Sequence, residues 1–269
     1  MIDLPVADVN YFTAFENPLS DYLLPDRFTY PFAYTPHALS LLAAAQLQVH
    51  LENQKDWVPD FGLINAIDTS ELGKMFGVLV VTTAQNEIGY LSAFSGKLAG
   101  GNHHPKFVPP VFDTLLEGGF VSLGMKELTH MTNEINTLLT LNLEEHSQRI
   151  LVLKKARKEH STALQDKIFE QYIFLNQAGV EKSLLAIFET TIVKKPQSGA
   201  GECAAPKLLQ YAFSHNMKPI ALAEFWWGSS PKSELRKHGS FYPSCLEKCK
   251  PILGHMLEGM ELEAALEQE

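Results

Sequence analysis

The stretch MFGVLVVTTAQNEIGYLSAFSG, residues Met75 to Gly96, decides the fold because it carries the clearest strand signal in the chain. It contains two runs rich in β-branched and aromatic residues, Met75 to Thr83 and Ile88 to Gly96. A short and mainly polar segment, Ala84 to Glu87, separates the two runs. Two such runs joined by a short loop predict a β-hairpin.

The segment before the hairpin predicts an irregular strap followed by one helix. The first 35 residues carry aromatic side chains and prolines without a regular period, so we expect them to pack onto the body through their rings. Thr35 and Pro36 are typical of a helix start, with Thr35 as the N-cap and Pro36 in the first turn. Apolar residues then recur at helical spacing, at Leu39, Leu42, Ala43, Leu47 and Leu51.

The segment after the hairpin predicts a helical region. From about Lys126 to Leu175, apolar residues recur at steps of three and four between charged residues. This pattern predicts an amphipathic helix or part of a helical hairpin. Ser183 to Phe188 predicts a further short helix, and Thr190 to Val193 predicts a short strand.

The final third of the chain has its own order of elements. A glycine-rich turn leads to Cys203, which starts a predicted helix. The apolar run over residues 220–227 predicts a buried strand. A last helix is expected to carry Cys245 and Cys249 in its first turn.

Together these elements predict an α/β fold: a small sheet with a hairpin, flanked by helices in three layers, with an inserted helical segment resembling a coiled coil. The division of the chain that we expect follows the same elements. Residues 1–125 form the strap, helix and β-hairpin, and residues 126–190 form the helical insertion. Residues 191–260 form a cysteine-containing α/β segment that packs on the hairpin, and residues 261–269 form an acidic tail or linker.

The composition limits the class of protein. The chain has 269 residues, of which 45% are hydrophobic and 20% charged, as in ordinary globular proteins. No run approaches the roughly 18–20 uninterrupted apolar residues of a membrane span. The N-terminus, MIDLPVADVNYF, lacks the basic region and apolar core of a secretory signal. The predicted location is therefore the cytoplasm, where thiols stay reduced.

The cysteines of the sequence are candidate metal ligands. Cys203 sits at a predicted helix start, and Cys245 and Cys249 share one face of the next helix. The helix dipole favours thiolates at such positions. The set fits a tetrahedral zinc site that lacks one ligand, which His238 or water could complete. The alternative is that the cysteines are buried thiols that only fill space.

The order of the elements is similar to that of zinc-dependent deaminases of nucleosides and nucleic acids. In those proteins a hairpin precedes a helix with a His or Cys ligand, a strand, and a Pro-Cys-x-x-Cys helix. We therefore expect a deaminase-like three-layer arrangement. The second motif here is longer by one residue on each side, and Ala205 stands where the proton-shuttling glutamate is expected. Glu202 and Glu224 are the nearby candidates for a catalytic carboxylate.

A second candidate site is a nucleotide-sized groove beside the cysteines. The formal net charge of −9 opposes non-specific binding of nucleic acid, so any RNA contact must be local. An aromatic plane beside basic side chains suits a stacked base and its phosphate. The alternative is that both tryptophans are buried and the basic residues are simply solvated. The predicted nucleotide-binding residues are Lys207, Trp226, Trp227, Lys232, Arg236 and Lys237.

Several longer motifs carry a more specific resemblance. They are GAGECAAPKLLQYAF (199–213), KPIALAEFWWGSSPKSELRKHGSFYPSC (218–245), KCKPILGHMLEGM (248–260), KMFGVLVV (74–81), GYLSAFSGKLAG (89–100), NHHPKFVPPVFD (102–113) and FLNQAGVEKSLL (174–185). The chain closely resembles the long N-terminal extension of bacterial pseudouridine synthases of the ribosomal-large-subunit pseudouridine synthase A family. The resemblance implies a role in RNA modification. The catalytic domain of that family carries an Arg-Leu-Asp motif, and this sequence contains none.

Three functions of different classes follow from these observations. The first is an accessory, RNA-engaging region of a pseudouridine-synthase-type protein that does not isomerise uridine by itself. The second is a zinc-dependent deaminase-like enzyme, or a degenerate relative, acting on a base or nucleoside. The third is an interaction module in which the cysteines only pack. Metal content separates the third function from the others, and a deaminase assay separates the second from the first.

Overall fold

The computed structural model describes residues 11–55, 57, 61–63, 73–231 and 234–266. Its centre is a mixed α/β body with a four-stranded sheet in the order β1-β3-β2-β6. The strands are β1 (Thr13–Ala14), β2 (Lys74–Thr82), β3 (Ile88–Phe94) and β6 (Lys218–Trp227). All neighbouring strands run antiparallel.

The predicted hairpin is confirmed. Strands β2 and β3 pair from Phe76↔Phe94 to Thr82↔Ile88, as two adjacent β-rich runs with a short connection should. The predicted strand over residues 220–227 is also present, as β6. It pairs with the other edge of β2, so β2 lies in the middle of the sheet.

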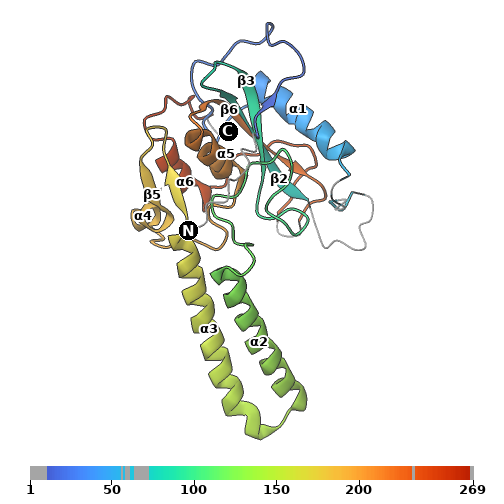
Figure 1. The fold of residues 1–269 in the computed structure, drawn as a ribbon, viewed down its shortest axis with the longest axis vertical. Coiled ribbons are helices and arrows are strands. Elements are labelled where there is room, and N and C mark those ends of the chain that lie inside the picture. The colour runs from blue at the N-terminus through green and yellow to red at the C-terminus, as the bar shows by residue number, and fades with distance from the viewer. Residues whose placement is uncertain (1–10, 56, 58–60, 64–72, 232–233, 267–269) are drawn as a thin grey trace.

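Helices cover both faces of this sheet (Figure 1). Helix α1 (Ala38–Asn53) packs on one face, and its Leu39 and Leu47 share a buried cluster with Val78 and Val80. Helices α5 (Ala204–Ser214) and α6 (Cys249–Met256) pack on the other face. Because side chains alternate along a strand, β2 supplies apolar residues to both layers.

The start of α1 differs from the prediction of Thr35 and Pro36. The N-cap is His37, whose Nδ1 accepts a hydrogen bond from the Leu39 backbone N–H at 3.2 Å. The ring nitrogen of His37 satisfies a free amide of the first turn in the way that an Asn or Ser side chain does. Pro36 therefore lies before the helix and not in its first turn.

The described part of the N-terminal segment packs as the predicted strap. Tyr11 meets Tyr211 edge to face, and Phe15 lies against Tyr90, with ring centroids about 5.4 and 5.3 Å apart. The Leu222 backbone N–H donates to the Thr29 hydroxyl at 3.1 Å. Rings and backbone bonds together attach this segment to the sheet.

The helical region is a hairpin that projects from the body (Figure 1). Helix α2 (Phe120–Leu141) is joined through a short 3₁₀ helix, η1 (Glu144–His146), to helix α3 (Ser147–Glu170). Arg149 bonds Glu134 across the two helices at 2.7 Å. The hairpin alternative of the sequence prediction is therefore the observed one, although α2 begins earlier than Lys126. The prediction of helix as far as Leu175 is wrong, because α3 ends at Glu170 and residues Ile173–Leu175 form a strand.

A small unit connects this hairpin to the body. Strands β4 (Ile173–Leu175) and β5 (Glu181–Ser183) form a two-stranded sheet, and the predicted short helix follows as α4 (Leu184–Glu189). The prediction of a strand over Thr190 to Val193 is wrong. The Thr190 and Thr191 hydroxyls donate to the Ile187 and Phe188 carbonyls, which closes the end of α4 with a turn.

No helix among the described residues is both long and apolar enough to cross a bilayer.

One glycine sets how closely α5 approaches the sheet. A Cβ on Gly77 of β2 would lie 2.9 Å from Ala204 Cβ and 3.1 Å from Leu208 Cδ1. We expect Gly77→Ala to lower the free energy of unfolding by roughly 1–3 kcal/mol, because the added methyl pushes α5 from the sheet. Urea unfolding measures this change.

The matched control is Gly254→Ala in α6. A Cβ there meets nothing within 4 Å, so the substitution should raise stability by about 0.5–1 kcal/mol through helix propensity. Equal effects of the two substitutions would contradict the close approach of α5 at Gly77.

Candidate metal centre

The fold brings the cysteines of the chain together. Cys203 is the N-cap of α5, Cys249 is the first residue of α6, and Cys245 lies in the loop between β6 and α6. Their Sγ atoms all lie within 4.8 Å of one another. The predicted convergence of the three thiols is confirmed, with Cys203 and Cys249 at the starts of two helices.

The placement of Cys245 in the first turn of a helix is wrong. Residues 246–248 form a turn, and α6 begins only at Cys249. The backbone N–H groups of Lys248 and Cys249 point at the Cys245 sulfur. Cys245 therefore acts like a capping residue outside the helix, and it still reaches the other two thiols.

The three sulfurs differ in exposure. Cys249 is buried, Cys203 is half-buried and Cys245 is exposed. The cluster is therefore closed towards the core and open towards solvent at Cys245. A structural metal site is normally closed on all sides, whereas a site with an open position can accept water or a ligand.

The pKa values of the three cysteine thiols are shifted in different directions. The pKa of Cys245 is lowered well below that of an ordinary thiol, first by hydrogen bonds from the Cys203 and Cys249 thiols and then by the two backbone N–H groups. The same contacts raise the pKa of Cys203, through the bond to Cys245, and burial raises it further. The pKa of Cys249 is raised by its hydrogen bonds to both partners and by burial. One thiolate thus accepts hydrogen bonds from two thiols.

This donor set fits a metal ion. Two sulfurs bound to one zinc at about 2.3 Å and at tetrahedral angles lie about 3.8 Å apart. The observed limit of 4.8 Å between ligand atoms is within about 1 Å of that value. Thiolates are soft ligands that favour zinc, copper(I) and iron–sulfur clusters. The described residues could therefore bind a metal ion through these cysteines.

The histidine predicted to complete the site lies elsewhere. The Gly228 backbone N–H donates to His238 Nδ1 at 2.9 Å, and the His238 ring packs on Trp227 at 4.2 Å between centroids. Within the described residues, the group of mutually close ligand atoms contains the cysteines and does not include His238. His238 therefore fixes the strand end.

Glu224 is the buried carboxyl beside the cysteines. Its side chain is 3% exposed. The Ala205 backbone N–H donates to Oε1 at 3.3 Å, and the Ser244 hydroxyl donates to Oε2. Burial raises the pKa of Glu224 to about 7, although the bonds from Ser244 and Ala205 lower it. The sequence identified Glu224 but gave no sign of Ser244 as its partner.

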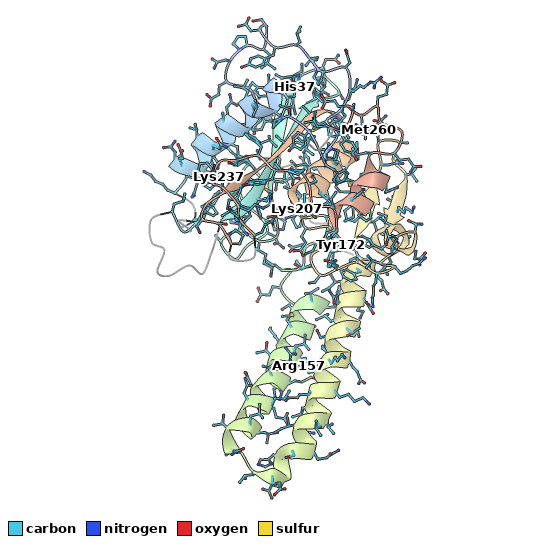
Figure 2. The ribbon with its side chains drawn as sticks, turned by 180° about the vertical axis from the view of Figure 1, so that it is seen from behind. His37, Arg157, Tyr172, Lys207, Lys237 and Met260 are labelled. Carbon is cyan, nitrogen blue, oxygen red and sulfur yellow. The ribbon has the colours of Figure 1, made fainter. Side chains whose placement is uncertain are left out.

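Glu202, the other candidate carboxyl, lines a cavity that Glu224 does not line. The Tyr172 hydroxyl donates to its Oε1 at 3.2 Å, and Figure 2 shows Tyr172 where the helical hairpin meets the body. Glu202 lines a cavity of about 630 Å³ together with residues of α2, α3 and the turn at Gly199. Its carboxylate is therefore directed to the base of the hairpin.

Lys207 does not fit the predicted role in nucleotide binding. It is 3% exposed, and its Nζ donates to the Phe94 and Gly96 carbonyls, both at 3.0 Å. Burial lowers its pKa to about 8. Figure 2 places Lys207 within the body. The ammonium group ties α5 to the end of β3.

The two tryptophans face opposite sides, as strand alternation predicts. Trp227 is buried on the α1 side of the sheet, so its ring is not available for stacking. Trp226 is half-buried, and its Nε1 donates to the Ser229 carbonyl at 3.1 Å. Trp226 alone of the pair keeps a partly open ring.

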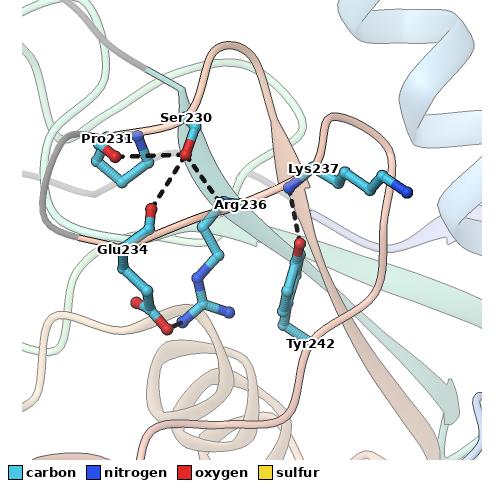
Figure 3. Close-up of polar contacts among 6 residues, drawn as sticks. All are labelled: Ser230, Pro231, Glu234, Arg236, Lys237 and Tyr242. Atoms are coloured by element: carbon cyan, nitrogen blue, oxygen red, sulfur yellow. Dashed lines mark hydrogen bonds and ion pairs between the residues drawn. The ribbon is translucent and has the colours of Figure 1, made fainter.

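The loop after β6 is held by internal bonds (Figure 3). Arg236 pairs with Glu234 at 2.7 Å and lies over the Tyr242 ring at 4.2 Å. The Lys237 backbone N–H donates to the Tyr242 hydroxyl at 2.7 Å, while the Lys237 side chain is exposed. The predicted contact residue Lys232 lies outside the described residues.

Comparisons with family models, with curated proteins and with solved structures found no match for this chain.

The unequal sharing of protons predicts which thiol reacts. In the metal-free, reduced protein we expect iodoacetamide to label Cys245 first, because it is exposed and its lowered pKa keeps it as the thiolate. Its rate should fall much less between pH 8 and pH 6 than that of an ordinary thiol, which slows on the order of 100-fold. Peptide mass spectrometry identifies the labelled cysteine.

Cys245→Ser is the control, and it should remove the fast, pH-insensitive phase. A labelling rate that falls about tenfold per pH unit, or first labelling of Cys203, would contradict the assigned thiolate.

Proposed function

We propose that this chain is a zinc-binding accessory region of an RNA-modification protein of the pseudouridine synthase type. In this proposal the region engages RNA and does not isomerise uridine by itself. The observation that carries the metal-binding part is the convergence of the Cys203, Cys245 and Cys249 sulfurs within 4.8 Å. Zinc is the proposed ion because it binds thiolates in tetrahedral sites and needs no redox partner.

The proposed zinc ion would join segments that are distant in sequence. Cys203 starts α5, and the other two ligands follow β6, so one ion would fix both segments over the same face of the sheet. A reducing compartment such as the cytoplasm would keep the thiols available. The open side at Cys245 would leave the fourth position to water or to a ligand.

The RNA part of the proposal is supported by the resemblance and by local charge. The net charge of −9 disfavours a broad basic surface, so the contact would be small. Two exposed lysines are candidates for this contact: Lys250 follows Cys249 in the first turn of α6, and Lys237 lies in the loop tied to Tyr242. The sequence lacks the Arg-Leu-Asp motif, so no catalytic aspartate is proposed.

Metal content tests the proposal directly. We expect one zinc ion per chain after purification in reducing buffer, measured by elemental mass spectrometry. Cys203→Ser and Cys245→Ser should lose the ion, because each removes one of the three proposed cysteine ligands. His238→Ala is the matched control and should retain it, since the ring packs on Trp227. A reduced wild type that takes up no zinc would rule out this function.

The same proteins test the RNA part. Single-stranded RNA should bind the wild type, and Lys237→Ala should weaken binding for all sequences and lower the salt slope by about 1. Lys158→Ala, an exposed lysine of α3, is the control. The wild type should form no pseudouridine in ribosomal RNA. Equal RNA affinity of the wild type and Lys237→Ala, or pseudouridine formation, would overturn this part.

A second candidate function is a deaminase-like enzyme acting on a base or nucleoside. It is favoured by the order of the hairpin β2–β3, α5 with Cys203, β6, and the Cys245 loop with α6. With α1 on the opposite face, this order supports the deaminase-like three-layer arrangement. A bound zinc ion would supply a Lewis acid. Glu224 would then carry the proton, because its carboxyl lies at the Ala205 amide.

Ammonia release tests the second candidate. Under it, zinc-loaded wild type should convert an exocyclic amine of cytidine, adenosine or a short single-stranded oligonucleotide to a carbonyl, with uptake of water and release of ammonia. Glu224→Gln should lower the rate by about 10²–10⁴-fold, as loss of a general acid–base does. If the wild type releases ammonia no faster than Cys203→Ser does, the deaminase-like function is ruled out.

A further inference from the structure

We propose that Glu224 is a positioning residue that holds the two cysteine-bearing segments around the metal centre. The inference rests on the metal-binding part of the proposed function, and it names the group that organises the ligands. It differs from the second candidate function, in which Glu224 carries a proton.

The two oxygens of one carboxylate reach both segments. Oε1 accepts the Ala205 backbone N–H at 3.3 Å, and Ala205 is two residues after Cys203. Oε2 accepts the hydroxyl of Ser244, the residue before Cys245. Glu224 therefore connects the start of α5 to the loop that precedes α6. A change in its position would move both segments relative to each other.

The backbone of Glu224 is itself fixed. Its N–H donates to the Tyr34 hydroxyl at 3.0 Å, and its carbonyl accepts the Tyr242 N–H at 2.9 Å. The Tyr34 hydroxyl in turn donates to the Tyr242 carbonyl at 3.3 Å. Glu224 also pairs with Gly77 on the central strand. The carboxylate thus projects from a rigid point of the sheet.

Packing alone does not account for a carboxyl at this place. The side chain is 3% exposed, and burying a carboxyl is costly unless its oxygens are hydrogen-bonded. An apolar residue would leave the Ala205 N–H and the Ser244 hydroxyl without a partner in a buried site. Both oxygens are used, one on each cysteine segment, as expected for an outer residue that orients metal ligands.

Zinc affinity gives the first test. Competition with a chromophoric chelator is measured for the wild type, Glu224→Ala, Glu224→Gln and Ser244→Ala. We expect Glu224→Ala to weaken zinc binding by about 10–100-fold. Glu224→Gln should stay within about threefold, because the amide oxygen can accept from Ala205 and the amide NH₂ can donate to Ser244. The cobalt(II) spectrum should change for Ala and stay tetrahedral for Gln.

The matched control is Thr29→Val. The Thr29 hydroxyl accepts the Leu222 N–H at 3.1 Å, so this variant also removes a buried bond to β6, but at a position that carries no bond to the cysteine segments. It should lower stability and leave zinc affinity unchanged. A general loosening of the sheet would instead affect Thr29→Val and Glu224→Ala alike.

A metal-free measurement separates this inference from the proposed function. In glutathione redox buffer, the two thiols of Cys203 and Cys245 form a disulfide while one oxidised glutathione is reduced to two glutathione thiols. The equilibrium gives the effective concentration of one thiol at the other. We expect Glu224→Ala to lower it at least tenfold and Glu224→Gln to preserve it, with the pair identified by peptide mass spectrometry.

Each outcome decides one question. A wild type that binds no zinc, combined with a lowered effective concentration in Glu224→Ala, defeats the zinc proposal and supports the positioning role. An unchanged effective concentration in Glu224→Ala overturns the positioning role. The role is also overturned if Glu224→Gln lowers the effective concentration as much as Glu224→Ala does. If circular dichroism shows that Glu224→Ala is unfolded, Ser244→Ala decides the question. An effective concentration of the two thiols lowered about threefold or more supports the positioning role, and a smaller change overturns it.

Discussion

The pairing of β2 on both of its edges is the interaction on which the rest of the structure depends. The strand lies between β3 and β6, and residues Phe76 to Val81 are buried. Its alternating side chains supply both apolar layers, one under α1 and the other under α5 and α6. Without this strand, both layers would lose buried apolar residues, and β6 would lose the strand with which it pairs from Lys218 to Trp227.

The position of the cysteine cluster follows from the same strand. Gly77 presents no side chain, which lets the start of α5 lie close to the sheet. Its cross-strand partner Glu224 fills the space beside it and bonds Ala205 and the loop residue Ser244. The cysteines therefore meet over the position in the sheet where Gly77 of β2 and Glu224 of β6 are cross-strand partners.

The sequence predicted the elements whose signals are local. The hairpin, the strand β6 and the helical region are each encoded by a continuous pattern, and the meeting of the cysteines followed from helix starts on either side of one strand. The sequence did not predict three features: the turn before Cys249, the packing of the His238 ring on Trp227, and the burial of Lys207. Each depends on which distant backbone group lies nearby, and residue spacing does not encode that information.

A buried lysine, Lys207, lies in the same helix as the start of the cysteine cluster. Metal binding requires deprotonated thiols, and burial together with hydrogen bonding raises the pKa of Cys203 and Cys249. Burial lowers the pKa of Lys207, while the negative charges of Glu202 and Cys203 raise it. The ammonium is also fixed by the Phe94 carbonyl. A metal ion bound at this cluster would therefore have to displace protons from Cys203 and Cys249, next to a lysine whose own charge is favoured by Glu202 and Cys203.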